Sequence, residues 1–148
     1  MSDGAAASGV AGTRRLFFAL WPDDELRARL VAATAPAVAE AGGRAVPAEN
    51  LHVTLAFLGA IATERVDAVV AAASAVPPVR GVERFDRLAA WGRDGPLVLE
   101  PSVPGSALAA LRRDLHSRLF AAGFPLEARE FRPHITLARR ASRRPTVA

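Results

Sequence analysis

Two of the three histidines in this 148-residue chain stand in the same short motif. The sequence LHVTL at 51–55 recurs as PHITL at 133–137, so His52 and His134 are each followed by a threonine two residues later and a leucine three residues later. Side chains alternate along a β-strand, so the histidine and threonine of each copy would project from one face, about 7 Å apart. The repeat predicts two strands that each present an imidazole and a hydroxyl on an otherwise apolar segment.

Two imidazoles and two hydroxyls facing each other suit phosphoester transfer without a metal ion. A neutral histidine takes a proton from the nucleophile, and the second histidine, as imidazolium, gives one to the leaving oxygen. The hydroxyls of Thr54 and Thr136 would donate to the non-bridging phosphate oxygens as negative charge builds in the transition state. We therefore predict His52 and His134 as the acid/base pair; the near-identical motifs leave open which is acid and which is base.

The composition excludes several competing chemistries. The chain has no cysteine, and all 19 of its basic residues are arginine. Thiolate catalysis, cysteine-ligated metal, Schiff-base lysines and the lysine of a P-loop are therefore excluded. Two motif histidines 82 residues apart make a poor zinc site. We expect neither a metal ion nor a cofactor.

The charge and apolar content describe a soluble globular domain. Hydrophobic residues make up 51% and charged residues 23% of the sequence, with a formal charge of +4. Arginine suits phosphate recognition because its planar fork donates two hydrogen bonds and keeps its proton. A GC-rich genome would enrich arginine and alanine equally well, so the composition leaves an anionic partner as one of two explanations.

No targeting or membrane segment is expected. The pair Arg14-Arg15 resembles a twin-arginine export signal, but the apolar run at 16–20 is too short and is followed by acidic residues at 23–25. No apolar stretch approaches the roughly 20 residues of a membrane span. We expect a cytoplasmic protein that binds no membrane and is a monomer.

The pattern of apolar residues predicts an α+β fold. Predicted strands cover 16–20, which looks buried, and 51–58, 82–91, 97–99 and 131–138; predicted helices run from Asp23 to Gly42, from Thr63 to the prolines at 77–78, and from Leu108 to Gly123. Residues 1–13 are expected to form a flexible tail, 14–140 a single domain and 141–148 a basic tail. Trp21 and Trp91 are interpreted as core or packing residues.

Both motifs and their flanks resemble the 2H phosphoesterase superfamily. With RLFFAL at 15–20 and RPHITLAR at 132–139, the chain is similar from about Leu16 to Arg140 to the bacterial and archaeal RNA 2',3'-cyclic phosphodiesterases, historically called 2'-5' RNA ligases. The resemblance implies a bilobal fold, in which two antiparallel sheet lobes related by a pseudo-twofold axis surround a central cleft with helices outside.

The resemblance also implies an activity and its substrates. The expected reaction is hydrolysis of a 2',3'-cyclic phosphate, on RNA 3' ends or nucleotides, to a 2'-phosphomonoester, with 2'-5' ligation as a side activity. Phe57 and Arg139 would hold the base between an aromatic ring and a guanidinium plane. Strict alternation points both side chains away from the histidines, so this role needs a strand twist or a bulge. Arg140 is the alternative to Arg139, because strict alternation places it on the same face as His134.

The sequence departs from the family pattern at its end. Family members usually continue well past the second motif, so an additional segment is expected to be missing and the strand around His134 to be left without a neighbour. Two other functions stay open. One is a noncatalytic module that binds RNA ends or nucleotides, and the other is hydrolysis of a small cyclic nucleotide rather than RNA.

Overall fold

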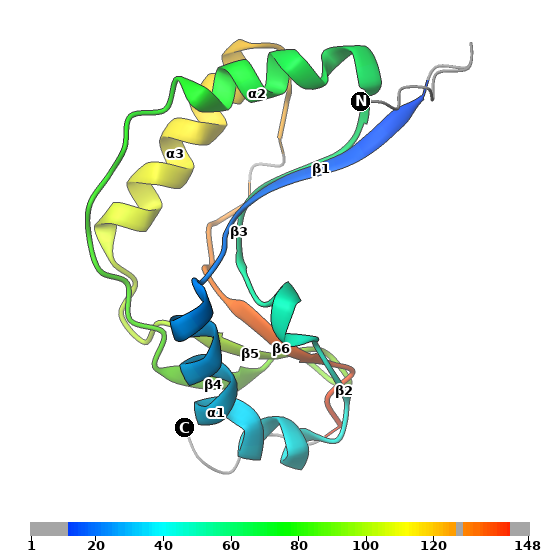
Figure 1. Cartoon of the computed structure of the whole chain (residues 1–148), viewed down its shortest axis with the longest axis vertical. Coiled ribbons are helices and arrows are strands. Elements are labelled where there is room, and N and C mark those ends of the chain that lie inside the picture. Colours follow the sequence, from blue (N-terminus) through cyan, green and yellow to red (C-terminus); the bar gives the residue numbers. More distant parts are fainter. Residues whose placement is uncertain (1–11, 127–128, 143–148) are drawn as a thin grey trace. The chain divides into compact units, whose positions relative to one another are not determined.

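The structure, a computed structural model, describes residues 12–126 and 129–142 (Figure 1). The α-helices are α1 (Asp24–Ala41), α2 (Val66–Ser74) and α3 (Ser106–Ala121), and the strands are β1 (Thr13–Leu20), β2 (Arg44–Ala45), β3 (Val53–Ala62), β4 (Arg87–Ala90), β5 (Leu97–Glu100) and β6 (Ile135–Arg139). Short 3-10 turns cover Ala48–Asn50 and Thr63–Arg65. These elements confirm the predicted α+β class.

The chain divides into two compact units, and the histidine and threonine of both motifs belong to the same one. The first unit takes Met1–Phe18, Leu55–Gly81 and Ser106–Glu130, and the second takes Ala19–Thr54, Val82–Gly105 and Phe131–Ala148. Strands β1 and β3 run from one unit into the other. The 81 residues between the histidines therefore include most of the first unit, although the histidine and threonine of each motif lie in the second.

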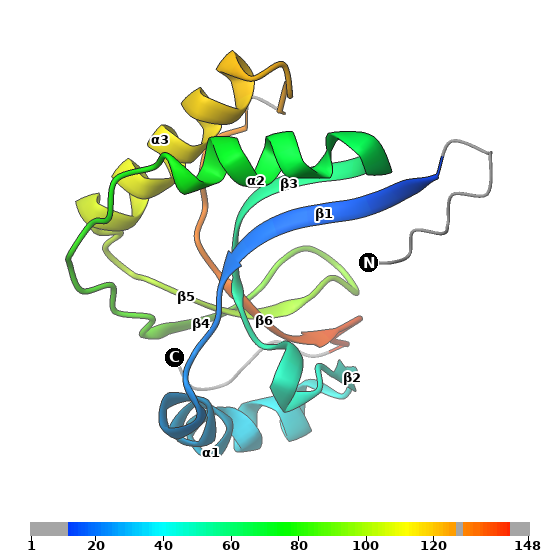
Figure 2. The same ribbon diagram turned by 45° about the horizontal axis from the view of Figure 1, so that its top comes forward.

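An antiparallel sheet forms the centre of the second unit (Figure 2). Strand β6 pairs with β3, β5 and the short β2, while β4 pairs with β5. The register sets Ile135 of β6 opposite Val53 of β3 and also opposite Leu99 of β5. Helix α1 accompanies this sheet and contacts β6. The expectation that the strand around His134 is left without a neighbour is therefore wrong, because β6 has β3 and β2 on one side and β5 on the other.

Helix α1 begins and ends where the sequence predicts. The Asp23 side chain caps it by accepting a hydrogen bond from the Leu26 N–H at 2.8 Å. Gly42 ends the helix in the left-handed conformation, with φ 78°. The next residue, Gly43, lies so close to β6 that a side-chain carbon there would clash with the Arg139 carbonyl oxygen. This close approach allows β2 to pair with the end of the motif strand.

The first unit combines the outer parts of β1 and β3 with α2 and α3. The two helices pack together, and Val69, Leu115 and Leu119 are buried. The N–H of Thr63 donates to the carbonyl of Gly12 at 3.0 Å, so the chain next to the start of β1 is bonded to the end of β3.

The predicted burial of the strand at 16–20 is wrong. Strand β1 is longer, Thr13–Leu20, and most of its side chains are exposed, including Phe17 at 43% and Leu20 at 42%. The physical reason is that β1 stands at one end of the strand order and has β3 as its neighbour on one side only.

Other boundaries differ from the predicted ones for local reasons. The strand expected at 82–91 is limited to β4; before it, the Glu83 carboxylate accepts from the Gly105 N–H and the Asp86 carboxylate accepts from the Ser102 N–H and hydroxyl. The last strand starts at Ile135 rather than 131, after Pro133, which has no N–H to donate to a neighbouring strand.

The predicted tails fall only partly on described residues. Residues 1–11 and 143–148 lie outside them, and Thr13 already belongs to β1. Ala141 and Ser142, placed in the predicted basic tail, donate backbone hydrogen bonds to the carbonyls of Gly95 and Ala41. Over the described ranges, the structure contains no helix with the length and apolar content needed to cross a membrane.

Candidate active site

The two motif histidines directly precede two paired strands. His52 stands before β3 and His134 before β6, and these strands pair antiparallel at Val53 and Ile135. Both of those residues are buried, whereas the histidines before them are only partly buried. The alternation predicted from the sequence is therefore present at both copies, with the apolar residue inside and the imidazole on the other face.

The antiparallel register brings each histidine near the threonine of the other copy. Continuing the Val53–Ile135 register by one residue in each direction sets His52 across from Thr136 and His134 across from Thr54. Directly opposed residues in an antiparallel pair project from the same face. The two imidazoles and two hydroxyls thus share one face within the second unit.

Both imidazoles are held in the same way at one nitrogen. His52 Nδ1 lies 2.7 Å from the carbonyl oxygen of Asn50, and His134 Nδ1 lies 2.8 Å from that of Arg132. A carbonyl oxygen only accepts, so Nδ1 carries the proton and donates in both rings. The Nε2 atoms are the nitrogens left to exchange a proton with a substrate.

The first motif has an additional internal contact. His52 Nε2 lies 3.1 Å from the hydroxyl oxygen of Thr54. With Nδ1 protonated, the hydroxyl donates to a neutral Nε2 and accepts from it when the ring is an imidazolium. Because the hydroxyl has a single proton, Thr54 can donate to a phosphate oxygen when it accepts from the imidazolium, and must leave Nε2 to do so when the ring is neutral.

Each motif histidine also packs against a tryptophan. The ring centroids of Trp21 and His52 are 4.7 Å apart, and those of Trp91 and His134 are 4.3 Å apart. The interpretation of both tryptophans as core or packing residues did not include this contact with the histidines, and Trp21 is 51% exposed. No local signal indicated this role, since Trp21 follows the predicted strand at 16–20 whereas Trp91 is the last residue of the one predicted at 82–91.

The position of Arg139 is set by an irregularity in β6. Between β5 and β6 the register shifts after Thr136, because β6 has one extra residue there. Leu137 and Ala138 are consecutively buried, and the next residue, Arg139, is exposed. The shift resets the alternation, so Arg139 returns to the face of His134 and Thr136. The bulge that the family resemblance required is thus present in β6.

Phe57 shows the same order of burial in β3. Two consecutive buried residues, Leu55 and Ala56, precede an exposed Phe57, which repeats the pattern of β6 residue by residue. Phe57 belongs to the first unit, where the Arg15 guanidinium lies 5.3 Å from its ring centre. The rival residue Arg140 is also exposed and adopts a left-handed backbone with φ 55°.

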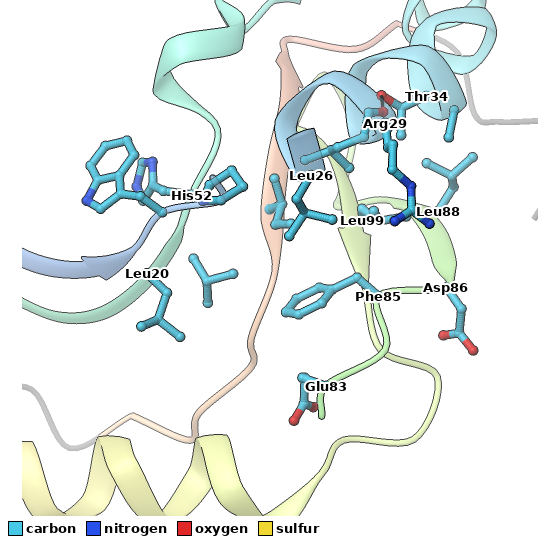
Figure 3. Close-up of a pocket in the computed structure, with 16 residues that line it drawn as sticks. Leu20, Leu26, Arg29, Thr34, His52, Glu83, Phe85, Asp86, Leu88 and Leu99 are labelled. Atoms are coloured by element: carbon cyan, nitrogen blue, oxygen red, sulfur yellow. Dashed lines mark hydrogen bonds between the residues drawn. The ribbon is translucent and has the colours of Figure 1, made fainter. Parts of the chain in front are cut away.

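A cavity of about 640 Å³ lies on the opposite face of the same sheet. Its walls include Val53, Leu99 and Ile135, the buried partners across β3, β5 and β6. Figure 3 shows Leu26 and Arg29 on one side of it and His52 on another. Of the two histidines and two threonines of the motifs, only His52 lines this cavity, whose wall includes five residues of α1. The cavity therefore does not coincide with the face where the hydroxyls meet.

The third histidine lies outside the motif face. His116 of α3 belongs to the first unit, and its Nε2 is 3.2 Å from the Leu55 carbonyl oxygen. Burial, together with the positive charge of Arg112, lowers the pKa of His116 below its ordinary value. In the ranges the structure describes, no cluster of three or more histidine and acidic side chains could hold a metal ion.

Comparison with known proteins gives relatives over most of the chain. The family model described as the 2'-5' RNA ligase superfamily matches residues 22–148. The RNA 2',3'-cyclic phosphodiesterase of Escherichia coli is 34% identical over 134 residues, covering 90% of this chain and 76% of the relative. The protein of the same name from Archaeoglobus fulgidus is 29% identical over 136 residues, with 90% and 77% covered.

Solved structures match the fold as well. E. coli LigT complexed with 3'-AMP superposes with a TM-score of 0.78 at 32% identity, covering 91% of this chain and 80% of LigT. TT0787 of Thermus thermophilus gives a TM-score of 0.70 at 27% identity, with 91% and 79% covered.

Proposed function

Because this chain belongs to the 2'-5' RNA ligase superfamily, we propose that it hydrolyses 2',3'-cyclic phosphates to 2'-phosphomonoesters, with His52 and His134 as the acid/base pair. The observation that carries this proposal is the shared face of β3 and β6, where both imidazoles have Nδ1 bound to a carbonyl and keep Nε2 for proton exchange. Relatives named RNA 2',3'-cyclic phosphodiesterase support the substrate class.

The proposed reaction needs one proton acceptor and one proton donor. Nε2 of the neutral histidine removes a proton from water as the water oxygen bonds to phosphorus. The bond between phosphorus and the 3' oxygen breaks, and Nε2 of the imidazolium protonates that oxygen. The phosphate stays on the 2' oxygen, and each turnover exchanges the protonation states of the two rings.

The hydroxyls of Thr54 and Thr136 are proposed to bind the non-bridging oxygens. These oxygens gain negative charge as the water attacks, so a fixed O–H donor stabilises the transition state more than the bound substrate. Both threonines are partly buried beside the histidines, which limits competition from water.

Phe57 and Arg139 are proposed as contacts to the nucleobase. Each is exposed and follows two consecutive buried residues of its strand. Stacking on a ring or a guanidinium plane is tolerant of base identity, which agrees with a substrate recognised mainly at its cyclic phosphate. The proposal covers RNA 3' ends and free cyclic nucleotides. It also covers 2'-5' ligation as a side activity, in which a 5' hydroxyl replaces water as the nucleophile and the 3' oxygen is again the leaving group.

The test is turnover of a 2',3'-cyclic nucleotide and of a short RNA ending in a 2',3'-cyclic phosphate, in EDTA. Wild type is compared with His52→Ala and His134→Ala, and His116→Gln serves as the matched control because it changes the histidine outside the motifs. We expect a 2'-phosphate product, lost in both motif variants and retained in the control. A folded wild-type protein that binds the nucleotide without converting it would replace the proposal by a noncatalytic binding module.

A further inference from the structure

A line of contacts in the second unit leads from a buried carboxylate to His134. Arg132 places its guanidinium carbon 4.2 Å from the centre of the Trp91 ring, and the Trp91 ring packs 4.3 Å from the imidazole of His134. Arg132 Nε donates to Glu100 Oε1 at 3.2 Å. We name Glu100, Arg132 and Trp91 the positioning stack.

Glu100 anchors this stack because it is buried and held at both carboxylate oxygens. It is 3% exposed, and its Oε2 accepts from Arg87 Nε at 3.1 Å. Arg87 and Glu100 are also cross-strand partners of β4 and β5. Removing a partner from a buried carboxylate strongly destabilises the folded protein. Glu100 is therefore held in the orientation that keeps both arginine contacts. The guanidinium it binds is correspondingly fixed.

Arg132 contacts the region of His134 in two ways. Its carbonyl oxygen receives the proton of His134 Nδ1 at 2.8 Å, and its guanidinium covers the ring of Trp91. The indole Nε1 of Trp91 is buried and has no hydrogen-bond partner among the described residues. Packing between the guanidinium and the imidazole, rather than a hydrogen bond of the indole, therefore sets the position of this ring.

We infer that Arg132 and Trp91 are positioning residues that hold the His134 imidazole in the orientation needed for proton transfer. This inference rests on the proposed function. Proton transfer is sensitive to geometry, and a displacement of about 1 Å costs on the order of 100-fold in rate. Loosening the stack therefore lowers kcat, while the substrate contacts that determine KM stay in place.

One pair of substitutions separates positioning from ion pairing. Arg132→Lys and Arg87→Lys make the same chemical change on the same carboxylate, but only Arg132 stacks on Trp91. A lysine keeps the charge and loses the planar fork. We expect Arg132→Lys to lower kcat about 10- to 100-fold with KM changed less than about two-fold, and Arg87→Lys to keep kcat within about two-fold. Equal losses in the two variants would overturn the inference.

A second comparison tests the ring and does not depend on the Arg132 variant folding. Trp91→Phe keeps an aromatic face against His134, whereas Trp91→Leu keeps only apolar volume. We expect Trp91→Phe to retain several-fold more kcat than Trp91→Leu at similar thermal stability. Equal kcat values in these two variants would show that the aromatic contact does not position the histidine.

A spectroscopic measurement separates this inference from the proposed function. Nitrogen-15 NMR of the unliganded protein reports the tautomer of each imidazole. The carbonyl that accepts from His134 Nδ1 belongs to the main chain and is kept in Arg132→Lys, so we expect the Nδ1–H tautomer in both proteins, with the His134 ring signals shifted and broadened in Arg132→Lys and those of His52 unchanged as the internal reference. Unchanged His134 signals would refute the stack even in an active enzyme. If the wild-type protein lacked turnover, the proposed function would fail, but this measurement would still show whether the positioning stack holds the His134 ring.

Discussion

Removal of the two motif hydroxyls is expected to cost different amounts of activity. Thr54→Val and Thr136→Val each delete one proposed donor to the phosphate oxygens while keeping a β-branched side chain. Loss of one such donor typically lowers kcat by about 100- to 1,000-fold, or about 2.7–4 kcal/mol. Little change in KM is expected, because the charge on these oxygens develops mainly in the transition state.

The structure makes Thr54→Val the more damaging of the two variants. Thr54 also contacts His52 Nε2 at 3.1 Å. A net contribution of about 0.5–1.5 kcal/mol for such a hydrogen bond corresponds to a further factor of about 2 to 12 in rate. We therefore expect kcat of Thr54→Val to fall below that of Thr136→Val by this factor.

The assay is steady-state hydrolysis of a 2',3'-cyclic nucleotide, with thermal unfolding measured in parallel. Thr54→Ser and Thr136→Ser are the matched controls, since serine keeps the hydroxyl and loses only a methyl group. Folded valine variants that keep more than about a third of the wild-type kcat would refute the donor role, as it requires losses of about 100-fold or more. Equal losses at both positions would refute the added role of the contact with His52.

The remaining predictions concern the histidines and one helix cap. Each of His52→Ala and His134→Ala should lower kcat about 100- to 10,000-fold, and the double variant should be no slower than the worse single one, because both rings act in one transition state. The lowered pKa of His116 favours its neutral form in the folded state, so the stability it contributes is complete above about pH 6.5 and is lost as the pH falls through the folded-state value. Denaturant unfolding at pH 7.5 and pH 5 should therefore show a larger loss for wild type than for His116→Gln, and parallel losses would contradict this. Asp23→Ala removes the cap of α1 and should lower the free energy of unfolding by about 1 kcal/mol in urea titrations, whereas an unchanged midpoint would show that the cap contributes nothing.

The sequence predicts the motif strands well because their signal is local. Val53 and Ile135 alternate with polar neighbours, and the structure buries both while leaving the histidines before them partly exposed. The capped start of α1 at Asp23 and its glycine end at Gly42 are equally local signals, and both are confirmed. Such features depend on a few adjacent residues and are therefore visible without any tertiary information.

The features that the sequence could not predict depend on neighbours distant in the chain. The exposure of Phe17 follows from the place of β1 at the end of the strand order, which its own apolar run does not encode. Likewise, the contact of Trp91 with His134 joins residues more than forty positions apart. The fixation of Arg132 by Glu100 depends on the pairing of β5 with β6, which no single segment specifies.

The extra residue at Leu137 makes chain length, rather than side-chain identity, the critical property of this stretch. Successive side chains of a strand point to opposite faces of the sheet, so one inserted residue moves every later side chain to the other face. Deleting Leu137 should leave His134 and Thr136 in place and turn Arg139 to the opposite face of the sheet. Exchanging Leu137 for another apolar residue should keep Arg139 on the face of His134. Single-residue deletions here would thus disconnect base recognition from phosphate chemistry, a separation that substitutions at the same position would not produce.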